Sequence, residues 1–195
     1  MTYLTQLSVD KSAAAGQRLQ DAYAWHKKLW KLFPGQDGAQ CEFLFRVDDS
    51  LTAFRVLLLS PSEPTAPGWA RMATKPVAES FLYYDRYRFQ IKANPTMRRS
   101  SDRRRLGIYG EDRLREWIHR KAEQHGFELE EDALDVRGPK DEVFFRKDKR
   151  GKHVAVDFRG ILDVRDRILF MQAFHKGIGS AKSFGYGLLM LQPIR

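Results

Sequence analysis

Three residues suited to acid–base chemistry lie close together in the segment Y-A-W-H-K-K-L-W-K, residues 23–31. Tyr23 and His26 are three positions apart and share one face of a predicted helix, with Lys31 about one turn further along. Histidine titrates near neutral pH and can transfer a proton when a phosphodiester of RNA is cleaved. Tyrosine can assist proton transfer, and lysine can stabilise charge that develops on the phosphate. The segment predicts a catalytic site, although a lone histidine on a helix is more often only a surface residue.

A second candidate site is the glycine-rich segment of residues 176–191, K-G-I-G-S-A-K-S-F-G-Y-G-L-L-M-L. Glycine adopts positive φ, so this segment can pack closely against another backbone or face a phosphate. It is neither a P-loop, because no Gly-Lys-Ser/Thr follows the first glycines, nor a dinucleotide-binding loop, because a strand follows it. Two interpretations stay open: a helix stop with a strand bulge, or a loop between two domains that faces an RNA backbone. The second predicts contacts from Gly177, Gly179, Lys182, Ser183 and Gly185.

Two clusters of basic residues lie in the second half of the chain. The predicted loop of residues 96–110 holds Arg98, Arg99, Arg103, Arg104 and Arg105. The predicted hairpin around K-D-K-R-G-K holds Arg146, Lys147, Lys149, Arg150 and Lys152. Such clusters are often merely solvated or protect an edge strand. Two of them in one half favour contacts to phosphates, and a basic hairpin could follow the groove of an RNA stem, because double-stranded RNA is recognised mostly by shape and backbone.

Composition supports a polyanionic partner. The 195 residues carry a net charge of +9 and are 43% hydrophobic, so a real core is expected. Residues 1–84 hold 9 Lys/Arg and 8 Asp/Glu, whereas residues 85–195 hold 25 and 17, so nearly all the net positive charge belongs to the second half. The single cysteine, Cys41, excludes an intramolecular disulfide and a multi-cysteine zinc site. No signal peptide or membrane-spanning run is recognised, which predicts a cytoplasmic protein.

The hydrophobic patterns predict two units with the same order of elements. The first has strands at 3–9, 43–47, 54–59 and 77–82, a helix at 18–33 and a weak helical pattern at 69–72. The second has strands or extended segments at 87–93, 127–136, 143–146, 153–162 and 188–191, with helices at 111–125 and 164–175. Asp163 is the candidate N-cap of the last helix and Gly177 its stop. The prediction is an α+β protein of two tandem ferredoxin-like (βαββαβ, RRM-like) domains, residues 1–84 and 85–195.

Taken together, the motifs resemble a known family. The N-terminal strand, Y-x-x-H-x-x-L-W-x-L-F-P, Y-R-F-Q-I-K-A-N-P and G-I-G-S-A-K-S-F-G-Y-G-L-L are similar to motifs of the CRISPR-associated RNA-processing endoribonucleases of type I-E systems, the CasE or Cse3 family. The resemblance covers nearly the whole chain, and the glycine-rich segment is its most specific part. It implies two tandem ferredoxin-like domains and cleavage of a CRISPR repeat RNA at the base of its hairpin, without a cofactor or metal ion.

The resemblance also implies roles for residues. The family's catalytic histidine corresponds to His26, its supporting tyrosine to Tyr23, a basic position to Lys31, and its groove-inserting hairpin to residues 146–152. The 2′-hydroxyl upstream of the scissile bond would attack the phosphate and leave a 2′,3′-cyclic phosphate, with His26 as general base or general acid. The implied partners are the RNA hairpin and the other subunits of a type I-E surveillance complex. The alternative is an RNA-hairpin-binding subunit without catalysis.

Overall fold

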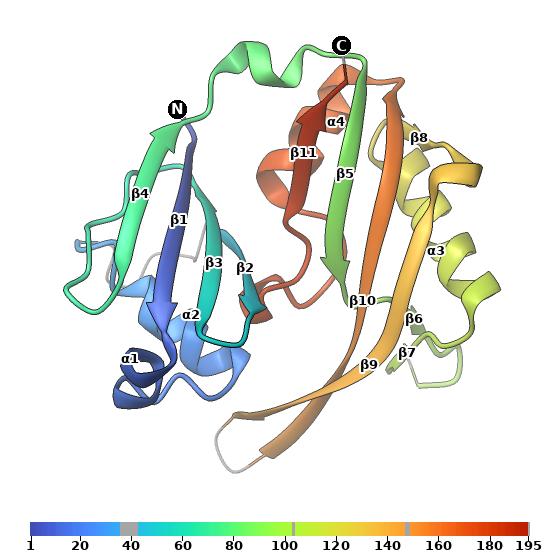
Figure 1. Ribbon diagram of the computed structural model, residues 1–195. Coiled ribbons are helices and arrows are strands. Elements are labelled where there is room, and N and C mark those ends of the chain that lie inside the picture. Colours follow the sequence, from blue (N-terminus) through green and yellow to red (C-terminus); the bar gives the residue numbers. More distant parts are fainter. Residues whose placement is uncertain (36–42, 103, 147–148, 195) are drawn as a thin grey trace.

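Two antiparallel sheets lie side by side in the structure, a computed structural model that describes residues 1–35, 43–102, 104–146 and 149–194 (Figure 1). The strands of the first sheet lie within residues 3–76 and those of the second within residues 86–193. Residues 77–85 connect the two sheets along one edge of the molecule.

The first sheet has the strand order β4-β1-β3-β2, and every neighbouring pair is antiparallel. Its strands are β1 (Tyr3–Asp10), β2 (Leu44–Asp49), β3 (Ala53–Ser60) and β4 (Arg71–Pro76), and its helices are α1 (Lys11–Gly16) and α2 (Ala22–Trp30). β1 forms where Leu7 and Val9 alternate with polar residues, and both side chains are fully buried against the helical layer. The order is that of a ferredoxin-like unit.

The end of this first unit differs from the prediction. No helix forms at 69–72, because β4 already begins at Arg71, and residues 77–82 contain the short 3-10 helix η1 (Glu79–Leu82) where a strand was expected. β1 fixes the place of β4: the hydroxyls of Thr5 and Thr74 lie opposite each other and form a hydrogen bond of 2.9 Å. The connection 61–70 contains three prolines, which lack the N–H that a helix requires, so it crosses the sheet without a helix.

The second sheet has the order β11-β5-β10-β8, with β9 also paired to β10. Its strands are β5 (Arg86–Ala93), β8 (Phe127–Leu129), β9 (Asp135–Arg146), β10 (Lys149–Val164) and β11 (Leu189–Pro193), and its helices are α3 (Glu111–Gln124) and α4 (Arg167–Lys176). The β9–β10 hairpin extends well beyond both sheets (Figure 1). This unit has the complete βαββαβ order, so the predicted class of two ferredoxin-like domains is confirmed.

Three details of the second unit correct the predictions. α4 begins at Arg167 with Asp166 as its N-cap, whose carboxylate accepts a hydrogen bond from the backbone N–H of Leu169 at 3.0 Å. Asp163, the expected cap, lies in β10 and pairs with Arg86 at 3.4 Å. The expected loop 96–110 contains a small hairpin, β6 (Thr96–Arg98) with β7 (Arg105–Gly107), and the 3-10 helix η2 (Glu131–Ala133) interrupts the extended segment 127–136. Gly177 does end α4, with φ of 72°.

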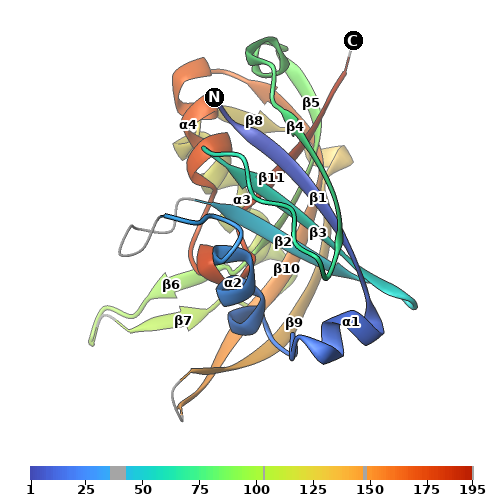
Figure 2. The ribbon, with the colours of Figure 1, turned by 90° about the vertical axis from the view of Figure 1, so that its left-hand side faces the viewer.

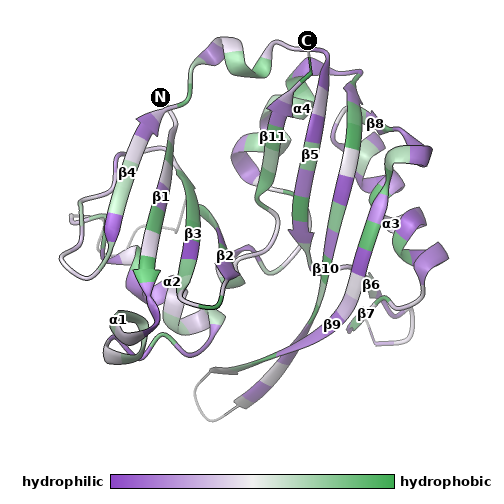
Figure 3. Ribbon diagram, viewed as in Figure 1, coloured by the Kyte–Doolittle hydropathy of each residue, from purple (hydrophilic) through white to green (hydrophobic). Residues whose placement is uncertain are grey.

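Two hydrophobic cores hold these units together. The side chains of β5 alternate between polar and apolar residues, a pattern visible as bands of colour in Figure 3, and Tyr87, Phe89 and Ile91 are buried. These three residues belong to the core of the second unit, and this core also includes Leu44 and Leu59 from the first sheet. Because apolar side chains from both units share it, the units are joined by burial and not only by the connecting chain.

A buried ion pair also joins the units. Arg46 of β2 is 5% exposed, and its Nη1 lies 2.7 Å from Oδ1 of Asp157 on β10. Its Nε donates to Oδ1 of Asp48 at 2.6 Å. In the part of the chain that the structure describes, no helix is long and apolar enough to cross a membrane.

Candidate active site

Helix α2 carries His26 and Tyr23 at the edge of the first core. Its N-terminus is capped by Asp21, whose Oδ1 accepts a hydrogen bond from the N–H of Ala24 at 2.8 Å. Trp25 is buried beneath the sheet. His26 and Tyr23 are half-buried, as expected for residues that flank the buried stripe of a helix. α2 ends at Trp30, earlier than predicted, so Lys31 is the exposed residue that follows the helix.

Aromatic rings surround the imidazole of His26. The centroid of its ring lies 5.5 Å from that of Phe43 and 6.2 Å from that of Phe45. Burial among these groups lowers the pKa of His26 below its usual value of 6.5. The ring is therefore uncharged at neutral pH and has a nitrogen lone pair that can accept a proton.

The glycine-rich segment packs directly onto β2, the strand that also supplies Phe45. A Cβ at Gly177 would lie 2.8 Å from Leu44 Cδ2, and a Cβ at Gly185 would lie 3.2 Å from the Phe45 ring. A Cβ at Gly187 would lie 2.6 Å from the carbonyl oxygen of Ile178, within the segment itself. These three glycines have φ of 72°, 82° and 86°. Only glycine satisfies both the close approach and the positive φ.

A cluster of four aromatic rings connects the three elements that the sequence singled out. Phe184, in the 3-10 helix η3 (Lys182–Phe184), stacks on Tyr23 of α2 with centroids 6.4 Å apart. Phe184 also lies 4.4 Å from Phe144 and 4.6 Å from His153, on the part of the β9–β10 hairpin that extends beyond the sheet. Figure 2 shows α2 beside the segment that carries η3. We call Tyr23, Phe184, Phe144 and His153 the aromatic cluster.

A polar network fixes the hairpin base to the glycine-rich segment. The hydroxyl of Tyr186 donates to Glu142 Oε2 at 2.5 Å, and Lys92 Nζ donates to Glu142 Oε1 at 2.8 Å. Burial and the adjacent carboxylate raise the pKa of Tyr186 far above its usual value, so the phenol keeps its proton. For Glu142, Lys92 and Tyr186 outweigh burial and lower the pKa.

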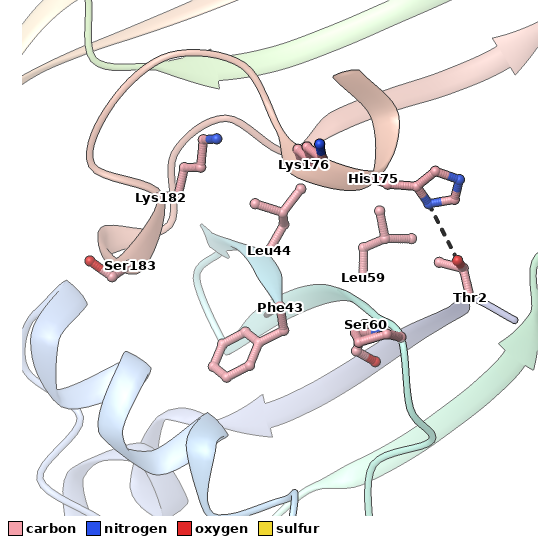
Figure 4. A pocket seen from close by; sticks show the side chains of 10 residues that line it. Thr2, Phe43, Leu44, Leu59, Ser60, His175, Lys176, Lys182 and Ser183 are labelled. Atoms are coloured by element: carbon pink, nitrogen blue, oxygen red, sulfur yellow. Dashed lines mark hydrogen bonds between the residues drawn. The ribbon is translucent and has the colours of Figure 1, made fainter. Parts of the chain in front are cut away.

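A groove of about 650 Å³ runs between the two units next to this cluster. Figure 4 shows Leu44 and Leu59 of the first sheet facing Lys176 and His175 at the end of α4. Lys182 and Ser183 of η3 lie on the same groove near Phe43, which in turn contacts His26. The groove thus places two lysines and a hydroxyl beside the aromatic residues around His26, a setting that suits a phosphate.

The other residues predicted to contact RNA belong to the β6–β7 and β9–β10 hairpins. The Cα atoms of Arg98 and Arg105 pair across β6 and β7, and Arg99 and Arg104 lie 3.7 and 3.4 Å from Asp102. On the large hairpin Arg150 is exposed, and Lys152 Nζ pairs with Asp141 Oδ2 at 2.9 Å. Arg103 and Lys147, together with the side chains of Arg146 and Lys149, lie outside the described residues.

Sequence reasoning missed the aromatic residues that join these parts. Phe184 stands inside the S-F-G of the glycine-rich motif, and Phe144 lies just before the basic turn, where a ring on a solvated hairpin is itself a signal. His153 lies at the start of the predicted strand 153–162, where its position gives no sign of a contact with the glycine-rich segment. Among the described residues, no group of three or more His, Cys, Asp or Glu side chains is placed to hold a metal ion.

The fold and these surfaces define a class: a protein of two ferredoxin-like units with a half-buried histidine beside a glycine-rich segment and a projecting basic hairpin. A family model described as CRISPR associated protein matches residues 2–193, and the chain belongs to this family.

The chain is also similar to individual proteins of known function. The chain is 31% identical to the CRISPR system Cascade subunit CasE of Escherichia coli over 186 residues, covering 90% of this chain and 94% of that protein. It is 27% identical to the CRISPR-associated endoribonuclease Cse3 of Thermus thermophilus, covering 98% and 100%. A structure of Cse3 bound to a 19 nt RNA superposes with a TM-score of 0.86 at 25% identity, covering 98% and 100%. The resemblance that the motifs indicate is confirmed.

Proposed function

We propose that this protein is an endoribonuclease that cleaves CRISPR precursor RNA at the base of the repeat hairpin and stays bound to the product. The similarity to Cse3, which is named an endoribonuclease and has a structure bound to an RNA representing a pre-cleavage complex, supports the reaction class. The similarity to a Cascade subunit supports a place in a multisubunit surveillance complex. The single observation that carries the proposal is the aromatic cluster, because it joins the histidine helix, the glycine-rich segment and the basic hairpin into one surface.

In this proposal the reaction needs no metal ion. The 2′-hydroxyl upstream of the scissile bond loses its proton and attacks the phosphate, the bond to the 5′-oxygen breaks, and this oxygen takes up a proton from water, so that a 2′,3′-cyclic phosphate and a 5′-hydroxyl result. The lowered pKa of His26 keeps its ring uncharged at neutral pH, which suits a general base that takes the proton of the 2′-hydroxyl. Tyr23 orients the nucleophile or assists the proton transfer, and Lys31 stabilises charge on the phosphate.

Substrate binding is assigned to the basic surfaces. The hairpin residues Arg146, Lys147, Lys149, Arg150 and Lys152 enter the groove of the stem, and Lys182 and Ser183 hold the phosphate backbone near His26. The arginines of residues 98–105 make further contacts to phosphates. Gly177, Gly179 and Gly185 bring the backbone of the glycine-rich segment close to the RNA.

The test is cleavage of a repeat hairpin by wild-type protein and by His26→Ala, with His119→Ala as a control: His119 is a half-buried histidine of α3 that contacts Glu131. Loss of a proton-transfer group costs about 10²–10⁴-fold in rate, so we expect His26→Ala to lose cleavage but to bind the hairpin as before. Cleavage should persist in excess EDTA and stop when the upstream 2′-hydroxyl is replaced by hydrogen. Full activity of His26→Ala would refute the catalytic assignment. Binding without cleavage by the wild-type protein would favour a non-catalytic hairpin-binding subunit.

A further inference from the structure

A second groove, of about 420 Å³, lies between α3, the small β6–β7 hairpin and the glycine-rich segment. We call it the α3 groove. Its lining contains six side chains that are basic or can become so: Arg98, Arg105, Arg120, Lys121, His125 and Lys182. They come from three segments far apart in the sequence, and no Asp or Glu is among the lining residues.

The positive charge of this groove is not neutralised within the described part of the chain. There, Arg98, Arg105, Arg120 and Lys182 form no ion pair, and Lys121 Nζ donates only to the neutral amide oxygen of Gln124, at 2.8 Å. Three nearby arginines that do not line the groove, Arg99, Arg104 and Arg115, have carboxylate partners.

The basic groups also repel one another. Burial, followed by Arg120, lowers the pKa of Lys121, and burial, followed by Lys121 and Lys176, lowers the pKa of Lys182. Burial, followed by Lys121 and Lys182, lowers the pKa of His125. A fold that gathers like charges in a concave site is less stable by itself and is stabilised by an anion bound there.

The groove is built on rigid parts of the protein. Trp117, in its wall, is buried and stacks on Phe158 with centroids 5.8 Å apart. The β6–β7 hairpin is held against β10, since a Cβ at Gly107 would lie 2.3 Å from Val154 Cγ2. Gly179, with φ of 87°, brings the glycine-rich segment within contact of Trp117. The backbone segments that carry the basic groups are therefore packed in place before a ligand arrives, which lowers the entropic cost of binding.

Lys182 connects this groove to the candidate active site. The same lysine lines both the α3 groove and the groove between the two units. The strands of the β6–β7 and β9–β10 hairpins point in different directions (Figure 2). RNA bound along the large hairpin and RNA bound in the α3 groove would therefore be different parts of one molecule, with Lys182 between the two grooves.

We infer that the α3 groove binds the phosphates of single-stranded RNA that flanks the repeat stem, an inference that rests on the proposed function. Exposed Met97 offers an apolar contact for a base in the same groove. A flexible single strand suits a concave groove of this size, whereas a double helix is wider and presents its phosphates on a convex surface. The groove would contact the same sugar–phosphate backbone whether the single strand lies on the 5′ or the 3′ side of the stem.

The experiment measures binding of three RNAs: a bare repeat stem-loop, the same stem-loop with a 5′ single-stranded extension, and one with a 3′ extension. All carry a 2′-deoxy nucleotide at the scissile position so that they are not cut. The test variant is Arg120→Gln with Lys121→Gln, two neighbouring residues of α3 that line the groove. The control is Arg71→Gln with Arg113→Gln, which removes the same charge from exposed positions outside every site described above. Thermal unfolding checks that each variant is folded.

We expect the test variant to lose the affinity gained from one extension and to keep its affinity for the bare stem-loop. The slope of log affinity against log salt for that extended RNA should fall by roughly 0.7 for each phosphate that is no longer neutralised, so by about 1.4 in the double variant. The extension that shows this effect identifies the side of the stem.

Equal weakening with all three RNAs, or the same behaviour as the control, would overturn the inference. The first result assigns the groove to the stem, and the second leaves it to another partner such as an acidic protein. Cleavage is measured separately on wild-type protein. A wild-type protein that binds but does not cut would refute the endoribonuclease and leave the groove test intact.

Discussion

Phe184→Ala tests whether the aromatic cluster positions the candidate active site. The ring of Phe184 lies between Tyr23 on α2 and the pair Phe144 and His153 on the hairpin. Its removal leaves those three rings without their common neighbour and removes the ring contact between η3 and Tyr23 of α2. The substitution alters neither His26 nor a basic side chain, so an effect on cleavage would come from geometry.

The size of the effect on stability follows from the contacts. Two ring pairs have centroids within 4.6 Å and the third is at 6.4 Å. Aromatic pairs contribute about 0.5–1.5 kcal/mol each beyond the area that they bury. A fully buried Phe→Ala change costs about 3–5 kcal/mol. Because Phe184 is only half-buried, we expect the free energy of unfolding to fall by about 2 kcal/mol. The cleavage rate should fall about 10²-fold, the cost of a displacement near 1 Å at the reacting groups.

Denaturant unfolding and single-turnover cleavage at saturating RNA measure the two quantities. Phe81→Ala is the matched control. Phe81 lies on the segment that connects the two sheets and is half-buried, and its ring centroid is about 6 Å from those of Tyr87 and Phe174. It should lose stability but keep its cleavage rate under conditions where it is folded. If folded Phe184→Ala cleaves as fast as wild type, the cluster is only packing and the positioning argument is wrong.

Three more predictions follow from other features. Gly187→Ala should destabilise the fold by about 1 kcal/mol or more in denaturant unfolding, because alanine is strained at positive φ and its Cβ would contact the Ile178 carbonyl. Lys149→Ala with Arg150→Ala should weaken binding to a bare stem-loop and lower its salt slope by roughly 0.7–0.9 per contact, without a change in melting temperature. Below about pH 6.5 the free energy of unfolding should fall, since burial lowers the pKa of four histidines in the folded state and the unfolded chain binds more protons there. A free energy of unfolding that stays constant between pH 7 and pH 5, the range in which histidines usually titrate, would contradict this prediction.

Much of the fold was predictable because its patterns are local. The alternation in β1 and β5 and the apolar face of α3 each determine an element within one stretch of sequence. Gly177 ends α4 as predicted, since a glycine with positive φ is a local feature of helix ends. The same locality explains why Tyr23 and His26 were found together on α2.

The errors arose where long-range pairing decided the structure. β4 has the polar sequence R-M-A-T-K-P and is a strand because β1 offers it an edge, whereas the more apolar residues 77–82 form η1. Asp163 resembles an N-cap, yet its pairing with Arg86 across the sheet extends β10 and leaves the cap to Asp166. The α3 groove could not be predicted for the same reason, because its cations come from separate segments.

The glycine-rich segment shows how two interpretations of one motif can apply to different residues. Close approach to Leu44, Phe45 and the segment's own backbone accounts for Gly177, Gly185 and Gly187 without any RNA, so contacts from the first two to a phosphate stay a prediction. Packing does not account for Lys182, which lines both grooves and has no carboxylate partner in the described part of the chain. A lysine costs free energy to desolvate, and burial lowers its pKa here. The glycines thus hold the segment close to the first unit, and the residue they hold there is the one that a phosphate would stabilise.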